Sequence, residues 1–164
     1  MKKVLLIPIL LFAGALFADP ITYLDPRGNL TGTATTDGGI TTYRDASGKI
    51  VGSSFQNGPQ IIYRNTSGRE IGTAAQSGNI TTYRDARGQI AGSATNEGNK
   101  ITYRDRASRI IGTATPSGNK TTYQDAQGKF IGSVSCGESN DFTREAFFQV
   151  LWTAKTSFRI GFPD

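Results

Sequence analysis

Histidine is absent from this sequence of 164 residues, and cysteine, methionine and tryptophan each occur once. Without histidine, the chain lacks the commonest general base and the commonest metal ligand of proteins. It also lacks a nucleophile elbow, a phosphate-binding loop and an EF-hand loop. Its regularly spaced Asp residues are single, whereas calcium needs about six to eight oxygen ligands. We therefore expect a protein that is not an enzyme and that has no metal and no cofactor.

The single cysteine, Cys136, excludes an intramolecular disulfide, so packing and hydrogen bonds must stabilise the fold. Nothing in the flanking sequence, Ser135, Gly137 and Glu138, would lower the pKa of its thiol. We expect a buried, inert thiol, with pairing to a second chain as the alternative.

Long runs of one charge are also missing. The net charge of +5 includes Lys2 and Lys3, and the chain beyond residue 18 has 16 basic and 13 acidic residues. The basic residues are dispersed with acidic residues beside them, which is typical of a solvated surface. We expect no nucleic-acid partner.

The N-terminal residues 1–18 form a secretory signal by pattern: two lysines, an apolar run from Val4 to Phe17, and small residues. The apolar run is shorter than the roughly 20 residues of a membrane-spanning helix. Cleavage is expected after Ala18, with Ala15 as the competing site. The sequence thus predicts an exported protein that is periplasmic, outer-membrane-associated or extracellular.

Six units of 20 residues occupy residues 19–135, the predicted repeat domain. Each unit has a tyrosine, an Asp or Asn two positions later, and several glycines at fixed places. The predicted core positions are Tyr23, Tyr43, Tyr63, Tyr83, Tyr103 and Tyr123, with Gly32, Gly52, Gly72, Gly92, Gly112 and Gly132.

Each unit predicts two strands and two turns, most plainly in the fourth unit. A strand over residues 80–85 precedes a first turn at 86–88, and a strand over 89–95 precedes a second turn at 96–99. Both turns place Gly where the backbone is left-handed; Ser108 replaces Gly at one first turn and must tolerate that conformation or reshape the turn. Asp is expected to accept hydrogen bonds from the amides of its own turn.

The expected register places Asp85 opposite Ile90, Tyr83 opposite Gly92, and Thr81 opposite Ala94. Tyr, Gly, Ile and Ala would then share one side, with the tyrosine ring lying over the glycine. The opposite side would carry Thr82, Arg84 and Ser93 and would be wetter.

Such units build either an antiparallel meander of hairpins or a β-solenoid. Arginines 20 residues apart would lie about 4.8 Å from each other in a solenoid and at twice that distance in a meander. Like charges repel more at the shorter spacing, which favours the meander. The predicted fold class is therefore all-β.

The units resemble the YD repeats of rearrangement-hotspot (Rhs) and teneurin proteins over residues 21 to about 135. The nearest matches are Tyr43 to Ile50 and Tyr83 to Ile90, although one residue separates Tyr from Asp here. The resemblance implies β-hairpins and a bacterial-envelope context. In that family the hairpins coil into a shell around cargo; six units are expected to be too few to enclose anything.

After Ser135 the composition changes, and six aromatic residues fall between Phe142 and Phe162. The apolar spacing predicts an amphipathic helix over residues 141–156 with Asn140 as its N-cap. We interpret residues 136–164 as a cap over the open end of the repeat array. The alternatives are attachment of the 141–158 segment to a membrane surface or a partner, and further strands.

The predicted function is a cell-envelope structural, adhesive or binding module whose partner is an unidentified envelope protein or glycan. Its candidate binding residues are Arg44, Arg64, Arg84, Arg104, Thr42, Thr82 and Thr102. One alternative is an ice- or small-molecule-binding array, suggested by Thr-Gly-Thr-Ala-Thr at residues 31–35. The least favoured alternative is an envelope-polymer hydrolase that uses Glu138 with Asp141 or Glu145.

Overall fold

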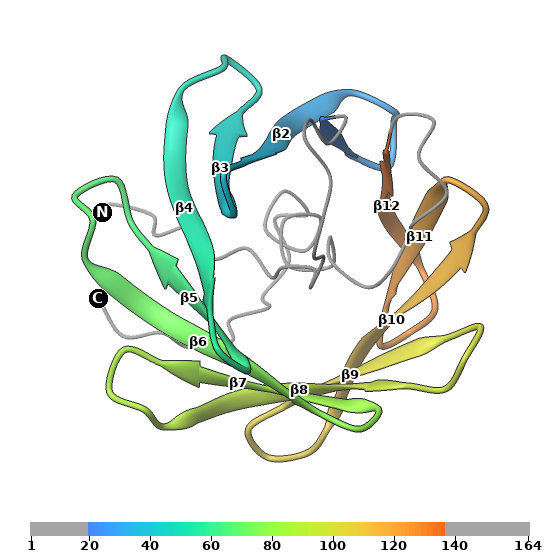
Figure 1. The fold of residues 1–164 in the computed structure, drawn as a ribbon. Helices are drawn as coiled ribbons and strands as arrows, with labels where there is room; N and C mark the ends of the chain where they lie inside the picture. The colour runs from blue at the N-terminus through green and yellow to red at the C-terminus, as the bar shows by residue number, and fades with distance from the viewer. Residues whose placement is uncertain (1–19, 137–164) are drawn as a thin grey trace.

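The computed structural model describes residues 20–136, and these residues form one all-β domain (Figure 1). Twelve strands follow one another along the chain without a helix between them. They are β1 (Ile21–Leu24), β2 (Leu30–Asp37), β3 (Ile40–Asp45), β4 (Ile50–Asn57), β5 (Gln60–Arg64), β6 (Glu70–Ser77), β7 (Ile80–Asp85), β8 (Ile90–Asn96), β9 (Ile101–Asp105), β10 (Ile110–Ser117), β11 (Lys120–Asp125) and β12 (Phe130–Ser135).

Each strand pairs antiparallel with its chain neighbours, which confirms the meander of hairpins and excludes the solenoid. The sheet also closes, because β1 pairs with β12. This closure corrects the expectation of an open array. Neither terminal strand is a free edge, so the reason given for a cap over the end of the array no longer holds. The predicted helix over residues 141–156 lies outside the described residues.

The six units are equivalent around the barrel. Tyr23 of β1 lies opposite Val134 of β12, and Tyr43 of β3 lies opposite Ala34 of β2 in the same register. The closing contact therefore repeats the contact between consecutive units. Corresponding positions of the six units form rings around the barrel axis, the first turns lie at one end, and the second turns lie at the other. Six units are thus enough to close a barrel.

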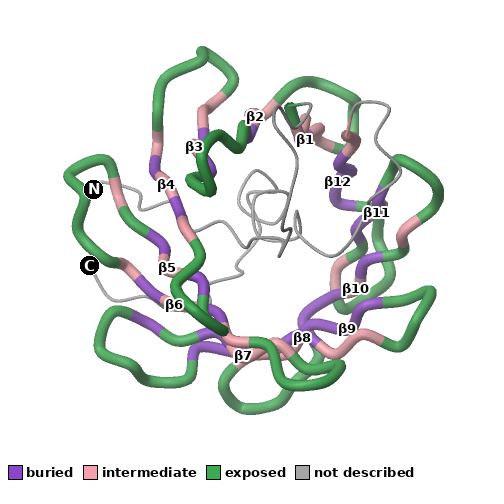
Figure 2. The backbone as a smooth tube through the Cα atoms, viewed as in Figure 1, coloured by how far each residue is buried: buried purple, intermediate pink, exposed green. Residues whose placement is uncertain are grey.

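The core occupies one face of the closed sheet. All six repeat tyrosines are buried, with exposed fractions between 0% and 7%. The six repeat glycines on the same face are also buried. Because a closed sheet has one inner and one outer face, the face that carries a continuous buried cluster is the inner one. Figure 2 shows this burial in the middle of the strands and exposure at the turns.

The first strand of each unit meets the second through a β-bulge. In the fourth unit Tyr83 lies opposite Gly92 and Thr81 opposite Ala94, as expected, but Ile90 lies opposite Arg84. The expected pairing of Asp85 with Ile90 is therefore wrong. The bulge brings the next residue, Ala91, into the core and leaves Ile90 51% exposed on the outer face.

The second strand carries its glycine for a different reason from the one expected. A Cβ atom built on Gly52 would lie 2.8 Å from the backbone oxygen of Arg64 on the neighbouring strand. No atom of Tyr43, which lies opposite Gly52, is among the nearest neighbours of that Cβ. At Gly52 the missing side chain makes room for the adjacent backbone, not for the tyrosine ring.

Candidate interaction surface

The first turns are held by the acidic or amide residue that precedes them. Oδ1 of Asp45 accepts hydrogen bonds from the amides of Ser47 (2.9 Å) and Lys49 (3.1 Å). Oδ1 of Asn65 accepts the equivalent pair from Ser67 and Arg69, each at 3.0 Å. This geometry agrees with the role expected for Asp. An amide oxygen serves the turn as well as a carboxylate does.

These hydrogen bonds lower the pKa of three of the carboxyl groups. For Asp25 the largest contribution is the side-chain hydrogen bond from Asn29, and for Asp45 it is that from Ser47. For Asp105 desolvation is the largest single effect and raises the pKa, but hydrogen bonds from Arg109 and Ala107 together lower it below the ordinary value. Folding therefore favours the charged form of Asp25, Asp45 and Asp105.

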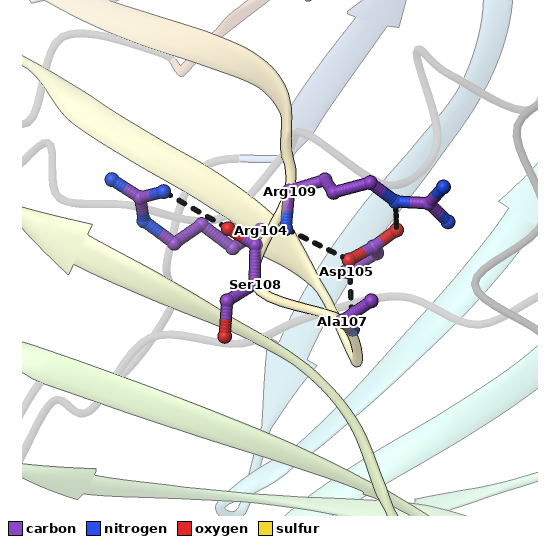
Figure 3. Close-up of polar contacts among 5 residues, drawn as sticks. All are labelled: Arg104, Asp105, Ala107, Ser108 and Arg109. Carbon is purple, nitrogen blue, oxygen red and sulfur yellow. Dashed lines mark hydrogen bonds and ion pairs between the residues drawn. The ribbon is translucent and has the colours of Figure 1, made fainter.

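Ser108 adopts the left-handed conformation that its turn requires, with a φ of 64°. Glycine holds this position in the other five first turns, with φ between 76° and 83°. Figure 3 shows the Ser108 turn with Asp105 accepting hydrogen bonds from the amides of Ala107 and Arg109. The guanidinium of Arg109 also forms an ion pair with Asp105 at 2.8 Å.

Four of the candidate binding residues are arginines on the outer face of β3, β5, β7 and β9. Three of them bond their own first turn through Nη1, which donates to the carbonyl oxygen four residues later. The distances are 3.0 Å for Arg44 to Gly48, 2.9 Å for Arg84 to Gly88, and 3.0 Å for Arg104 to Ser108 (Figure 3). The guanidinium of Arg64 instead lies 4.5 Å from the centroid of the Phe55 ring.

The three candidate threonines differ in accessibility. Thr42 and Thr82 are half-buried on the outer face, whereas Thr102 is only 5% exposed. Thr102 therefore offers little surface to a ligand. Thr42 and Thr82 lie on the curved outer face of a closed barrel.

The two sets of described turns differ in charge, which no single repeat unit indicates. The six first-turn segments (24–30, 44–50, 64–70, 84–90, 104–110 and 124–130) hold eleven Arg and Lys residues and six Asp and Glu residues. The five second-turn segments (36–40, 56–60, 76–80, 96–100 and 116–120) hold two of each. The first-turn segments therefore have a net charge of +5, and the second-turn segments have none. Because the meander places the first turns at one end, the charge of +5 lies at that end.

An apolar ring accompanies this charge. The residue that follows each first turn is exposed on the outer face, and in five units it is a large hydrophobic side chain. The ring comprises Leu30 (45% exposed), Ile50 (44%), Ile90 (51%), Ile110 (48%) and Phe130 (39%). We call the first-turn segments with this ring the basic end of the barrel. In the sequence, the apolar ring is indicated by two adjacent apolar residues after a first turn, as in Ile110-Ile111.

Among residues 20–136, no group of three or more His, Cys, Asp or Glu side chains is placed to hold a metal ion. The same residues include no helix of the length and hydropathy needed to cross a membrane. Cys136 is half-buried rather than buried, and its amide donates a hydrogen bond to the carbonyl oxygen of Asn119 at 3.3 Å. Glu138, Asp141 and Glu145 lie outside the described residues.

Comparison with solved structures found a protein of Arabidopsis thaliana, determined by X-ray crystallography, with a TM-score of 0.48. It shares 10% sequence identity with this chain, and the match covers 84% of this chain and 85% of that one. No protein-family model and no curated protein sequence matches this chain.

Proposed function

We propose that the chain is an exported, non-catalytic binding module of the cell envelope that contacts an envelope protein or glycan. The N-terminal pattern of lysines, apolar run and small residues supports export to the periplasm, the outer membrane or the exterior. The partial YD-repeat resemblance supports an envelope context. The absence of histidine supports a role in binding rather than in catalysis.

The observation that carries this proposal is the repetition of one polar surface around a closed barrel. Arg44, Arg64, Arg84 and Arg104 occupy equivalent outer positions of consecutive units. Their bonds to the turns or to Phe55 fix the guanidinium groups while leaving other N–H donors available. A repetitive partner can engage several units at once, which raises the overall affinity without a strong single site.

A glycan array and an envelope-protein pull-down with the chain from residue 19 onward test this function. We expect binding that weakens when Arg44→Gln, Arg84→Gln and Arg104→Gln are combined. The control variant, Lys100→Gln with Lys120→Gln, removes two cations from the second-turn end and should bind as the unchanged protein does. Thermal melting of each variant distinguishes lost binding from lost folding.

Two results would contradict the proposal. The first is no binding to any envelope glycan or protein by a folded chain. The second is the release of new reducing ends from an envelope polymer during incubation, which would show hydrolysis and favour the enzyme alternative. Fractionation of periplasm, outer membrane and medium checks the predicted export separately.

A further inference from the structure

We propose that the basic end of the barrel docks end-on against an anionic phospholipid surface. This inference rests on the proposed envelope location but not on glycan binding. It commits the first-turn end to one partner, a membrane surface that carries negatively charged headgroups.

Charge complementarity is the first support. Arg69, Arg87 and Arg106 lie in the first turns, and none of their side chains forms a hydrogen bond or an ion pair among the described residues. Arg27 also lies in a first turn, where its charge helps to lower the pKa of Asp25. The turn carboxylates, by contrast, are occupied by the amides of their own turns. The unpaired guanidinium groups are thus the groups available for phosphate, which arginine binds with a bidentate geometry.

The apolar ring favours a lipid surface over a soluble acidic polymer. Five large hydrophobic side chains remain between 39% and 51% exposed at one level of the barrel. Each follows its turn directly, so it lies only a few residues, at about 3.3 Å per residue, behind the turn tip. Amphipathic helices that lie on membranes combine basic and apolar groups in the same way and bury their apolar face roughly 5–10 Å into the headgroup region. A soluble acidic polymer would bury less apolar surface against these side chains than the acyl boundary of a membrane would.

The shape of the barrel places these groups together. Because the six units are equivalent around the axis, their first turns end at a common level and present a rim rather than a single loop. A flat surface can contact all six turns at once. The five described second-turn segments have equal numbers of acidic and basic residues, so they lack the same attraction.

Co-sedimentation with vesicles tests this docking. We expect the full chain from residue 19 to bind vesicles of phosphatidylcholine and phosphatidylglycerol in equal parts, and not to bind pure phosphatidylcholine. Each Lys or Arg near an anionic surface contributes about five-fold to partitioning. Combining Arg27→Gln, Arg69→Gln, Arg87→Gln and Arg106→Gln should therefore weaken binding at least about a hundred-fold.

A matched pair of apolar variants separates a lipid surface from a polyanion. Ile90→Ser with Ile110→Ser at the basic end should weaken vesicle binding at least about ten-fold. Ile40→Ser with Ile80→Ser changes two similarly exposed isoleucines, at 52% and 44%, at the second-turn end and should have no effect. Equal thermal melting of the two double variants would show that both are folded.

Three results would overturn the docking proposal. The first is that the two isoleucine double variants weaken vesicle binding equally. The second is that the four-arginine variant binds vesicles as the unchanged protein does. The third is that the protein binds dextran sulfate but not vesicles, and that the Ile90 and Ile110 substitutions leave the dextran sulfate binding intact. The last result would identify a soluble polyanion as the partner. That result would not contradict the proposed envelope-binding function. Conversely, if the protein bound vesicles but bound nothing on the glycan array or in the pull-down, only the envelope-binding function would be contradicted.

Discussion

The residue at the left-handed position of each first turn sets the steric cost of that turn. Five turns use glycine at the left-handed position, and the fifth unit uses Ser108 with a φ of 64°. A residue with a Cβ atom pays a steric penalty of roughly 1–2 kcal/mol in this region. Glycine removes the penalty but also gives the unfolded chain more freedom.

We expect Ser108→Gly to raise the free energy of unfolding by about 0.5–1 kcal/mol, measured by urea denaturation. The carbonyl oxygen of residue 108, which accepts the hydrogen bond from Arg104, remains in the variant. The reverse change at an equivalent turn, Gly88→Ser, should lower stability by a similar amount. Stabilisation by both substitutions would show that backbone strain does not govern these turns.

The pH dependence of stability follows from the same turns. Asp25, Asp45 and Asp105 have pKa values that folding lowers. Their stabilising contribution is therefore complete above the unfolded-state pKa, near 4, and is lost as the pH falls through the lower folded-state pKa. We expect the melting temperature to fall steeply below about pH 4.

Replacement of these three residues by Asn should reduce that acid sensitivity, because Asn65 already holds its turn with an uncharged oxygen. Asp45→Ala provides the control, since it removes the acceptor and should lower the melting temperature at neutral pH. An unchanged acid transition in the triple Asn variant would mean that other carboxyl groups control it.

At the scale of the strands, local signals predicted most of the fold. The β-branched and aromatic residues at 80–85 predicted a strand, and the regularly placed glycines predicted the turns, because both signals act within a few residues. The bulge was missed because Ile90 and Ala91 are both apolar, and the sequence does not show which of them enters the core. The exposed apolar ring was missed for the same reason.

A substitution in the hairpin of β7 and β8 tests whether the six repeat tyrosines serve packing. Tyr83 is 7% exposed in the inner cluster, so Tyr83→Ala should lower the free energy of unfolding by roughly 3–5 kcal/mol. Thr82→Ala, on the outer face of the same strand, should cost less than about 1 kcal/mol. If Tyr83→Ala left stability unchanged and abolished ligand binding, the tyrosines would be a binding platform instead.

At the scale of the whole molecule, closure was the feature that the sequence could not reveal. A 20-residue unit specifies its own hairpin and its contact with the next unit. Whether the sixth unit meets the first depends on the twist and tilt summed over twelve strands, which no single unit displays. The meander alone places the first turns along one edge, and closure bends that edge into a rim that carries both Arg27 and Arg106.

Removal of one strand tests the role of closure. Deletion of residues 20–24 eliminates β1 and exposes the edges of β2 and β12. We expect the shortened chain to form oligomers or aggregates in size-exclusion chromatography with light scattering. Inserting a Gly-Ser-Gly-Ser-Gly segment before Pro20 leaves β1 intact and should preserve the monomer. A monomeric deletion variant with unchanged melting temperature would argue that the β1–β12 contact is dispensable.

The closing contact also has a consequence for assembly during folding. Every other strand pair joins chain neighbours, whereas β1 and β12 come from the two ends of the described residues, so theirs is the contact with the largest loop entropy to overcome. The β1–β12 pair has the same register as the strand pairs that join consecutive units. The β12 strand of one open chain can therefore pair equally well with β1 of a second chain. Two such chains can exchange their ends and close a ring of twice the size without any new kind of interface. Protein concentration at the moment of closure then decides between the small ring and the large one.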